Sequence, residues 1–483
     1  MITRIKISGF KSLVNVDVEL GPFTCIAGTN AVGKSNFFDS LMFLSNLADK
    51  TLVDAAKSVR SDDKKYATLK DIFYKSGDSY SDTMKFELSM LIPTQTEDDL
   101  GQPAKASITS LQYNLELRYN EKDEENPITI ESEELLPITQ SNAKKNIGFE
   151  ATTIWKNNVI SGRKTTPFIS TQDGKVKIHQ DTKGAGPVSY QMGKMQRTLL
   201  SSATAEYPTA FMVRHELRSW RMLQLEPSAL RKPDDFDIRR NARLESNGAH
   251  LAATLYRLHN EIKNQDVYQQ VTNKLSNIIE GLEYVSVDKD EKRELLTLQV
   301  KYKGGGTFQA NTLSDGTLRF LGLTVLELDN KSDGVICFEE PENGIHPLKI
   351  AAIIELLQRI AVDTNYVVDE NNPFRQVIIN THSPVVVSIV PDDSLLMAEL
   401  EESYDEVRRI KYQHTVFKGL SDTWREDTEK KYSTITKGIL LNFLSPIEHP
   451  HNEIKHTLLK RVNRRVIDRT EIKSQLSLLF PEK

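Results

Sequence analysis

The sequence predicts an α/β fold built around a mostly parallel sheet, and three features of the chain support this prediction. An apolar strand near the beginning runs into a glycine-rich loop and then into a helix. Alternating strands fill the stretch after residue 80, where a β-rich lobe is expected. Between residues 303 and 400 strands and helices alternate again, as in βαβ units that return to one sheet.

The first fifty residues contain this strand, loop and helix. Residues 14–20 alternate between apolar and polar, which is typical of a half-buried strand, and residues 5–7 predict its partner. Residues 23–27 form a short apolar strand that leads into the loop 28–35, Gly-Thr-Asn-Ala-Val-Gly-Lys-Ser. A helix follows, with an apolar face over residues 38–44.

The remaining elements follow in order along the chain. Alternating patterns predict strands at 84–92, 108–119, 127–136, 284–288 and 294–302. Helical periodicity predicts helices between 247 and 282 and at 348–361, and apolar runs predict buried strands at 335–338 and 376–380. Residues 401–483 are charged, and we expect them to be helical.

Composition and charge exclude several classes of protein. The 483 residues, 39% hydrophobic and 27% charged, have the composition of a globular protein of about three domains. A formal charge of −5 gives no overall positive field, so DNA could contact only a local patch. No apolar run approaches the roughly 20 residues of a spanning helix and no signal peptide is expected, so we predict a cytoplasmic protein without membrane contact. Cys25 and Cys337 lie in apolar runs and are expected to be buried thiols in a reducing compartment.

The loop at 28–35 has the spacing G-x-x-x-x-G-K-S that binds nucleotide phosphates. Its glycines let backbone N–H groups turn toward the phosphates, and the helix N-terminus adds its positive end. In this pattern the lysine reaches the β- and γ-phosphates and the serine hydroxyl ligates Mg²⁺. The predicted nucleotide-binding residues are Gly28, Asn30, Gly33, Lys34, Ser35 and Asn36.

Acidic residues follow the apolar run 335–338 directly. If this run is a strand beside the strand at 23–27, the first acid, Glu339, would reach the metal. Glu340 would then polarise an attacking water as general base. The alternative is a core strand that ends in a solvated acidic turn. His382, within Thr-His-Ser-Pro at 381–384, follows a further apolar strand and is predicted to contact the γ-phosphate. A structural or surface histidine is the alternative there.

The motifs occur together with a further one, Leu-Ser-Asp-Gly-Thr-Leu-Arg at 313–319. The chain resembles the ABC-type ATPase heads of the SMC, Rad50 and RecF class in the order of four motifs. These are the loop with its following asparagine, the segment 313–319, Glu-Glu-Pro-Glu-Asn-Gly-Ile-His-Pro at 339–347, and Thr-His-Ser-Pro. It is most similar to the compact RecF-like and OLD-like ATPases of bacteria. The opening Gly-Phe-Lys-Ser at 9–12 is also similar to their first strand, and the resemblance covers residues 1–49 and 200–400.

The resemblance implies an ABC-type P-loop ATPase head with a β-rich lobe, a helical lid and an α-helical C-terminal extension. It implies that the nucleotide is ATP with Mg²⁺, and that hydrolysis is slow and regulatory. It also implies that Ser314, Asp315 and Gly316 form a signature loop that caps the γ-phosphate of ATP held by the other protomer. A homodimer or higher homo-oligomer is therefore expected, with a plain helix-capping turn as the alternative for these three residues.

On this basis we divide the chain into five parts. They are the N-terminal part of the ATPase head (1–49), an insertion and β-rich lobe (50–200), a helical lid with the strands after it (201–302), the C-terminal part of the head (303–400) and a helical extension (401–483). Residues 220–233 and 246–251 resemble the lid of the compact family.

No effector motif is recognisable in the chain. OLD-like proteins with their own nuclease need a glutamate and an Asp-x-Asp pair for metal, and residues 385–483 contain no such pair. The first hypothesis is therefore an ATPase subunit of a bacterial antiphage defence system, similar to PtuA of Septu, including retron-linked Septu, or AriA of PARIS. A separately encoded nuclease or toxin would be its partner.

Two other hypotheses stay open. The basic run at 455–469 could contact DNA phosphates in a RecF-like repair clamp, whereas a solvated or protein-docking face is the alternative. Arg214, Arg218 and Arg221 could likewise face phosphates or DNA, and the alternative is a solvated or ion-paired helical face. The third hypothesis is a nucleotide-controlled scaffold whose dimer closes on ATP and opens on hydrolysis.

Overall fold

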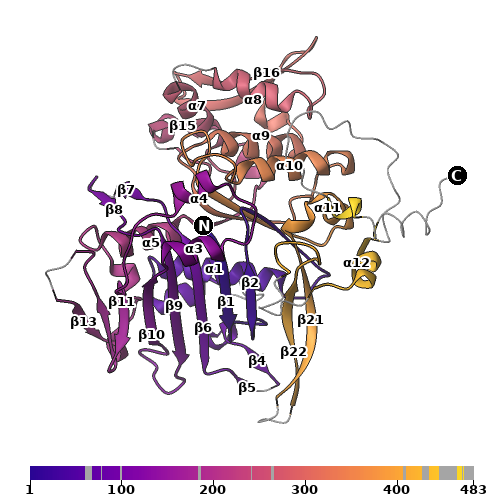
Figure 1. Cartoon of the computed structure of the whole chain (residues 1–483). Helices are drawn as coiled ribbons and strands as arrows, with labels where there is room; N and C mark the ends of the chain where they lie inside the picture. The colour runs from indigo at the N-terminus through magenta and orange to yellow at the C-terminus, as the bar shows by residue number, and fades with distance from the viewer. Residues whose placement is uncertain are drawn as a thin grey trace.

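The protein is a mixed α/β fold in which two large sheets and one small sheet form separate layers (Figure 1). The computed structural model describes residues 1–59, 68–77, 79–97, 101–182, 186–240, 242–262, 266–405, 410–426, 434–444, 465–469 and 472. The two large sheets carry the elements around the predicted nucleotide loop, and the small sheet lies mainly in the region predicted to be a lid.

The central sheet contains six strands within the described residues. In spatial order they are β14 (Arg221–Leu223), β19 (Gly334–Glu339), β20 (Arg375–Thr381), β3 (Phe23–Ala27), β21 (Leu395–Asp405) and β22 (Ile410–Lys418). Neighbouring strands are parallel from β14 to β21, so their carboxyl ends meet at one edge of the sheet. Cys25 and Cys337 are buried in β3 and β19, as predicted.

The second large sheet is antiparallel. Its order in the described part of the chain is β13 (Val188–Gln191), β12 (Lys175–Ile178), β11 (Ile169–Gln172), β10 (Ile128–Pro137), β9 (Ser110–Tyr119), β6 (Thr83–Leu91), β1 (Ile2–Ser8) and β2 (Val16–Glu19). The predicted strands at 84–92, 108–119 and 127–136 correspond to β6, β9 and β10. The first strands of the chain therefore share a sheet with the β-rich lobe.

Helices cover both faces of the central sheet. The helices of the described residues, over all the sheets, are α1 (Lys34–Leu47), α2 (Leu52–Ser58), α3 (Gln140–Asn146), α4 (Thr153–Val159), α5 (Pro208–Ser219), α6 (Pro227–Leu230), α7 (Leu251–Glu261), α8 (Val267–Leu275), α9 (Asp315–Leu328), α10 (Ile350–Ile360), α11 (Pro384–Ile389) and α12 (Lys437–Leu444). Alternate side chains of β19 enter two cores: Val335 and Cys337 pack with α1, α5 and the antiparallel sheet, whereas Ile336 and Phe338 pack with α7 to α10. Among the described helices, none combines the length and apolar character that crossing a bilayer requires.

The region predicted to be a lid, 201–302, contains most of the small sheet and the helices around it. Strand β17 (Leu295–Tyr302) pairs with β15 (Asp234–Asp235), β16 (Leu282–Asp290) and β18 (Thr307–Gln309). Strands β16 and β17 match the predicted strands at 284–288 and 294–302. Two short ribbons, β4 (Lys75–Ser76) with β5 (Ser79–Tyr80) and β7 (Gln95–Glu97) with β8 (Pro103–Lys105), lie outside these sheets.

The prediction of a helical extension from residue 401 is wrong for its first part. Strands β21 and β22 form a long hairpin at the edge of the central sheet (Figure 1). The β-branched and aromatic residues of β22 favour a strand, and Phe417 packs its ring 5.2 Å from that of Phe37 in α1. Among the described residues of the extension, α12 is an α-helix as predicted, and the basic positions 455–464 lie outside the described residues.

Candidate active site

The glycine loop joins β3 to α1 and is packed against the C-terminal hairpin. Gly33 has a φ of 96°, in the left-handed region, and a Cβ there would overlap the hydroxyls of Thr415 and Ser12. Glycine is therefore required at this position. Ser12 Oγ is hydrogen-bonded to Thr415 Oγ1 at 2.7 Å and accepts from Asn36 Nδ2 at 2.9 Å, so the loop is fixed by the first strands and by β22 together.

Lys34 begins α1, and its side chain lies within the curve of the loop. Its Nζ donates to the carbonyl oxygens of Gly28 and Thr29, both at 2.7 Å. Only 7% of the residue is exposed, and this burial lowers the pKa of Lys34, while the charges of Glu340 and Glu342 oppose the shift. An anionic ligand would compete with the two carbonyls for this ammonium group.

The two predicted acids lie at the carboxyl end of β19. Glu339 is its last residue, and Glu340 has a φ of 46°, which is uncommon for a residue with a side chain. The Glu340 carboxylate is bonded on both oxygens: Asn343 Nδ2 donates to Oε2 at 2.6 Å, and His382 Nδ1 lies 2.8 Å from Oε1. The structure thus places His382 next to the predicted general base.

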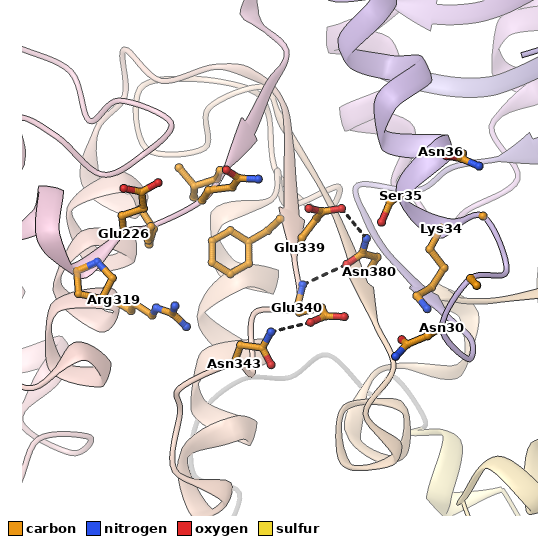
Figure 2. Close-up of a pocket in the computed structure, with 17 residues that line it drawn as sticks. Asn30, Lys34, Ser35, Asn36, Glu226, Arg319, Glu339, Glu340, Asn343 and Asn380 are labelled. Atoms are coloured by element: carbon orange, nitrogen blue, oxygen red, sulfur yellow. Dashed lines mark hydrogen bonds between the residues drawn. The ribbon is translucent and has the colours of Figure 1, made fainter. Parts of the chain in front are cut away.

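One cavity of about 740 Å³ joins these groups (Figure 2). The predicted site residues on its wall are Asn30, Gly33, Lys34, Ser35, Asn36, Glu339 and Glu340. Gly28 and His382 do not line the cavity. Gly28 accepts a hydrogen bond from Lys34 and His382 is hydrogen-bonded to Glu340, and both of these partners lie on the wall. The Ser35 hydroxyl and the Glu339 carboxylate are hard oxygen donors on the same cavity, so the residues present fit Mg²⁺.

Five further polar residues line the cavity and were not predicted. They are Gln224, Glu226, Arg319, Asn343 and Asn380. Gln224 and Glu226 follow β14, which spans only Arg221–Leu223 and is too short to give a clear strand pattern. Figure 2 shows Glu226 and Arg319 on the side opposite the glycine loop, with the two acids between them.

The predicted signature loop lies at the N-terminus of α9, outside the cavity of its own chain. Ser314 Oγ accepts from the backbone N–H of Thr317 at 3.3 Å, and Asp315 pairs with Arg231 of the lid. Ser314 therefore caps its own helix, as in the alternative from the sequence. Its contact with ATP in another protomer stays a prediction.

The arginines near α5 are bound within the chain. Arg214 and Arg218 pair with Asp49 at 3.1 and 2.9 Å. Arg221 donates to the carbonyl oxygen of Leu244 at 3.3 Å, and burial lowers its pKa. Arg214 and Arg218 therefore agree with an ion-paired helical face, whereas Arg221 lies in β14 and not on a helix.

Two arginines of the basic run are also engaged. Arg465 pairs with Asp468, and Arg469, whose side chain is 2% exposed, contacts Asp392 at 3.4 Å. Asp392 is therefore the partner of a buried arginine. The described residues contain no group of three or more His, Cys, Asp or Glu side chains suited to a metal ion. The other basic positions, Lys455, Lys460, Arg461 and Arg464, lie outside the described residues.

The ends of the parallel strands bring a glycine loop, its lysine and a pair of acids to one cavity. This arrangement defines a P-loop ATPase domain. Residues 191–388 match a family described as "AAA domain, putative AbiEii toxin, Type IV TA system". A comparison with curated proteins gives no match.

SMC head domains are among the solved structures found to be similar. The SmcHead bound to the C-winged helix domain of ScpA is 13% identical, with a TM-score of 0.45 over 87% of this chain and 98% of that one. The SMC head domain from Thermotoga maritima is 10% identical, with a TM-score of 0.36 over 87% and 99%. An Smc head domain with an extended coiled coil, bound to the C-terminal domain of ScpA derived from Pyrococcus furiosus, is 11% identical, with a TM-score of 0.39 over 86% and 96%.

Proposed function

We propose that the chain is the ATP-binding and hydrolysing subunit of a bacterial antiphage defence system, and that it controls a separate nuclease or toxin through an ATP-sandwiched dimer. The observation that carries the ATPase activity is the single cavity shared by Lys34, Ser35, Glu339 and Glu340. In this proposal Lys34 binds the β- and γ-phosphates, Ser35 and Glu339 hold Mg²⁺, and Glu340 is the general base.

Binding of ATP replaces bonds within the site. Lys34 Nζ leaves the neutral carbonyls of Gly28 and Thr29 for phosphate oxygens, which are stronger acceptors because they are charged. When bound, Mg²⁺ neutralises charge on the β- and γ-phosphate oxygens. Glu340 accepts the proton of the attacking water with an oxygen released by His382, and His382 then donates its ring N–H to the γ-phosphate.

The dimer is supported by the position of the signature loop. Ser314 and Asp315 are exposed and do not line the cavity of their own chain, as a loop that completes the site of a second protomer requires. Gln224 supplies a glutamine on the cavity wall, which we propose as the residue that senses the bound nucleotide.

The defence role rests on the resemblance of the ordered motifs and on the lack of an Asp-x-Asp pair in residues 385–483. The matched family, which is described as a putative toxin of a toxin–antitoxin system, covers residues 191–388. The second candidate is the RecF-like DNA clamp, favoured by the basic run at 455–469. Arg465 and Arg469 are engaged within the chain, so the clamp depends on the other basic positions of that run. It requires DNA binding that depends on ATP and weakens steeply with salt.

Two substitutions test the ATPase assignment. We expect Lys34→Ala to abolish binding of a fluorescent ATP analogue, and Glu340→Gln to bind it while hydrolysis falls by about 10²–10⁴-fold. The Glu340→Gln protein should also shift to a dimer with ATP in light-scattering chromatography. Lys164→Ala is a matched control, because Lys164 Nζ also donates to two backbone carbonyls, at 3.0 and 3.2 Å, outside the cavity. Wild-type hydrolysis by both site variants would refute the assignment.

The partner is tested by native mass spectrometry of the complex purified from its own host, with and without ATP. A second subunit that carries nuclease or toxin motifs supports the defence role. A bare homodimer that retains DNA favours the clamp instead.

A further inference from the structure

Asn380 occupies an unusual place between the two acids of the site. It is the last residue but one of β20, it is 2% exposed, and it pairs in register with Glu339 of the neighbouring parallel strand. Its side chain also lines the cavity (Figure 2). Nothing in its own chemistry suggests a direct role in hydrolysis, because an amide neither titrates nor ligates Mg²⁺ as strongly as a carboxylate.

The amide of Asn380 is bonded at both ends. Its Nδ2 donates to Glu339 Oε1 at 3.3 Å, and its Oδ1 accepts from the backbone N–H of Glu340 at 3.1 Å. The backbone oxygen of Asn380 accepts from the same N–H at 3.0 Å. A single residue of one strand therefore holds the side chain of the first acid and the backbone of the second.

These bonds solve a geometric problem in the acid pair. Successive residues of a strand point to opposite faces, so Glu339 and Glu340 would face apart if β19 simply continued. The left-handed φ of 46° at Glu340 ends the strand and brings both acids to one cavity. Such a conformation costs free energy in a residue with a side chain and persists only where neighbours fix it. Asn380 supplies that support.

We propose that Asn380 is a positioning residue that fixes the carboxylates of Glu339 and Glu340 relative to each other. It then governs hydrolysis and the Mg²⁺-dependent part of ATP binding, and not the binding of the nucleotide itself. This inference rests on the proposed function, because it takes Glu339 as the metal acid and Glu340 as the base.

The test uses the full chain with Asn380→Leu, which keeps the shape of the side chain and removes both polar groups. Binding of a fluorescent ATP analogue in EDTA should change by no more than about twofold, since Lys34 and its loop are intact. The Mg²⁺ concentration that gives half-maximal enhancement of binding should rise by about 10–100-fold, and kcat should fall by a similar factor with KM nearly constant. Asn380→Ser, with a smaller polar side chain, repeats the measurement if the leucine variant does not fold.

Two other asparagines provide controls. Asn372, just before β20, bonds Asp363 N–H at 2.8 Å and donates to the carbonyls of Asp363 and Val367 at 2.9 and 3.0 Å, outside the cavity. Asn372→Leu should lower stability and leave the Mg²⁺ dependence unchanged. Asn343 bonds only the Glu340 carboxylate among the two acids, so Asn343→Leu should lower kcat without changing the Mg²⁺ dependence.

The outcomes separate the two proposals. Wild-type Mg²⁺ dependence and kcat in Asn380→Leu would overturn the role of Asn380 and leave the ATPase assignment intact. Failure of the wild-type chain to bind ATP would overturn the assignment and this inference with it. In a Glu339→Gln background, the leucine substitution should add little to the loss of Mg²⁺ dependence, because the two residues act on one interaction.

Discussion

Glu133 illustrates how one buried side chain makes stability depend on pH. It lies in β10 with no exposed surface and accepts hydrogen bonds from the backbone N–H groups of Leu199 and Leu200 at 2.7 and 2.9 Å, and from the Tyr113 hydroxyl at 3.1 Å. Burial raises the pKa of Glu133 to about 7, although these bonds favour the charged form. The carboxyl group thus ties the antiparallel sheet to the turn before α5.

The sign of the pH effect follows from this raised pKa. Between a pH of about 4.5 and about 7 the folded protein keeps a proton that the unfolded chain has lost, so the free energy of unfolding falls as pH rises. Glu133→Gln cannot titrate. We expect the free energy of unfolding of Glu133→Gln minus that of the wild type to increase by about 2–3 kcal/mol between pH 5 and pH 8, measured by urea denaturation. Parallel pH profiles for the two proteins would show that Glu133 is not the source.

At the scale of single residues, the sequence could predict which groups meet at the cavity where their spacing carries the chemistry. Most of the loop 28–36 and the pair Glu339 and Glu340 lie on the cavity wall, while their binding of phosphate and metal stays a prediction. Asn343 and Asn380 could not be predicted. Their contacts depend on the pairing of β19 with β20 and on the backbone conformation of Glu340, which no local pattern encodes.

At the scale of elements, α9 connects the predicted signature loop to a buried arginine. Arg375, the first residue of β20, is 1% exposed and donates to the carbonyl oxygens of Leu326 and Glu327 at 2.6 and 3.1 Å. These are carbonyls of the last turn of α9, and the Leu326 oxygen also accepts from the backbone N–H of Asp329 at 3.3 Å. Strand β20 thus holds the end of α9 at its start and carries Asn380 and His382 at its other end.

Replacement of Arg375 should therefore destabilise the protein strongly. Arg375→Met removes two hydrogen bonds from a buried guanidinium and leaves the Leu326 oxygen with its bond from Asp329 alone, and we expect a loss of about 2–4 kcal/mol in the free energy of unfolding, measured with urea. Arg359→Met is the control, because Arg359 is 29% exposed and its pairs with Glu327 and Glu355 should contribute less than about 1 kcal/mol. Equal losses in the two variants would argue against a special role for Arg375.

Elements were predictable where a pattern was long enough. Strands β6, β9, β10 and β17 each show a period of two, because one face of each sheet is buried and the other is not. The three residues of β14 are too few for a pattern. The charged composition of residues 401–483 predicted a helix where β22 lies. The β-branched and aromatic residues of β22, among them Phe417, which packs on α1, favour the strand instead.

At the scale of the whole molecule, the residues after 400 contact the glycine loop and also fill part of the core that contains Ile336 and Phe338. Thr415 contacts Ser12 beside Gly33, and Arg425, 4% exposed, lies 4.1 Å over the Trp424 ring and donates to the carbonyl oxygen of Glu19 at 3.4 Å. Further apolar side chains from this part are buried in the main core: Leu420, Ile435, Leu440, Leu441, Leu444, Val466 and Ile472. These contacts join distant parts of the chain, so local composition could not predict them.

Removal of residues 401–483 should therefore unfold the remaining chain. Each of the buried apolar side chains contributes roughly 1.5–3 kcal/mol, so the seven together contribute roughly 10–20 kcal/mol as an upper estimate. The whole stability of a domain is about 5–15 kcal/mol, which the loss would match or exceed. The truncated chain should lack a cooperative thermal transition by circular dichroism and should not bind an ATP analogue. A folded, ATP-binding fragment would instead mean that the hairpin and α12 are an appendage to a complete ATPase head.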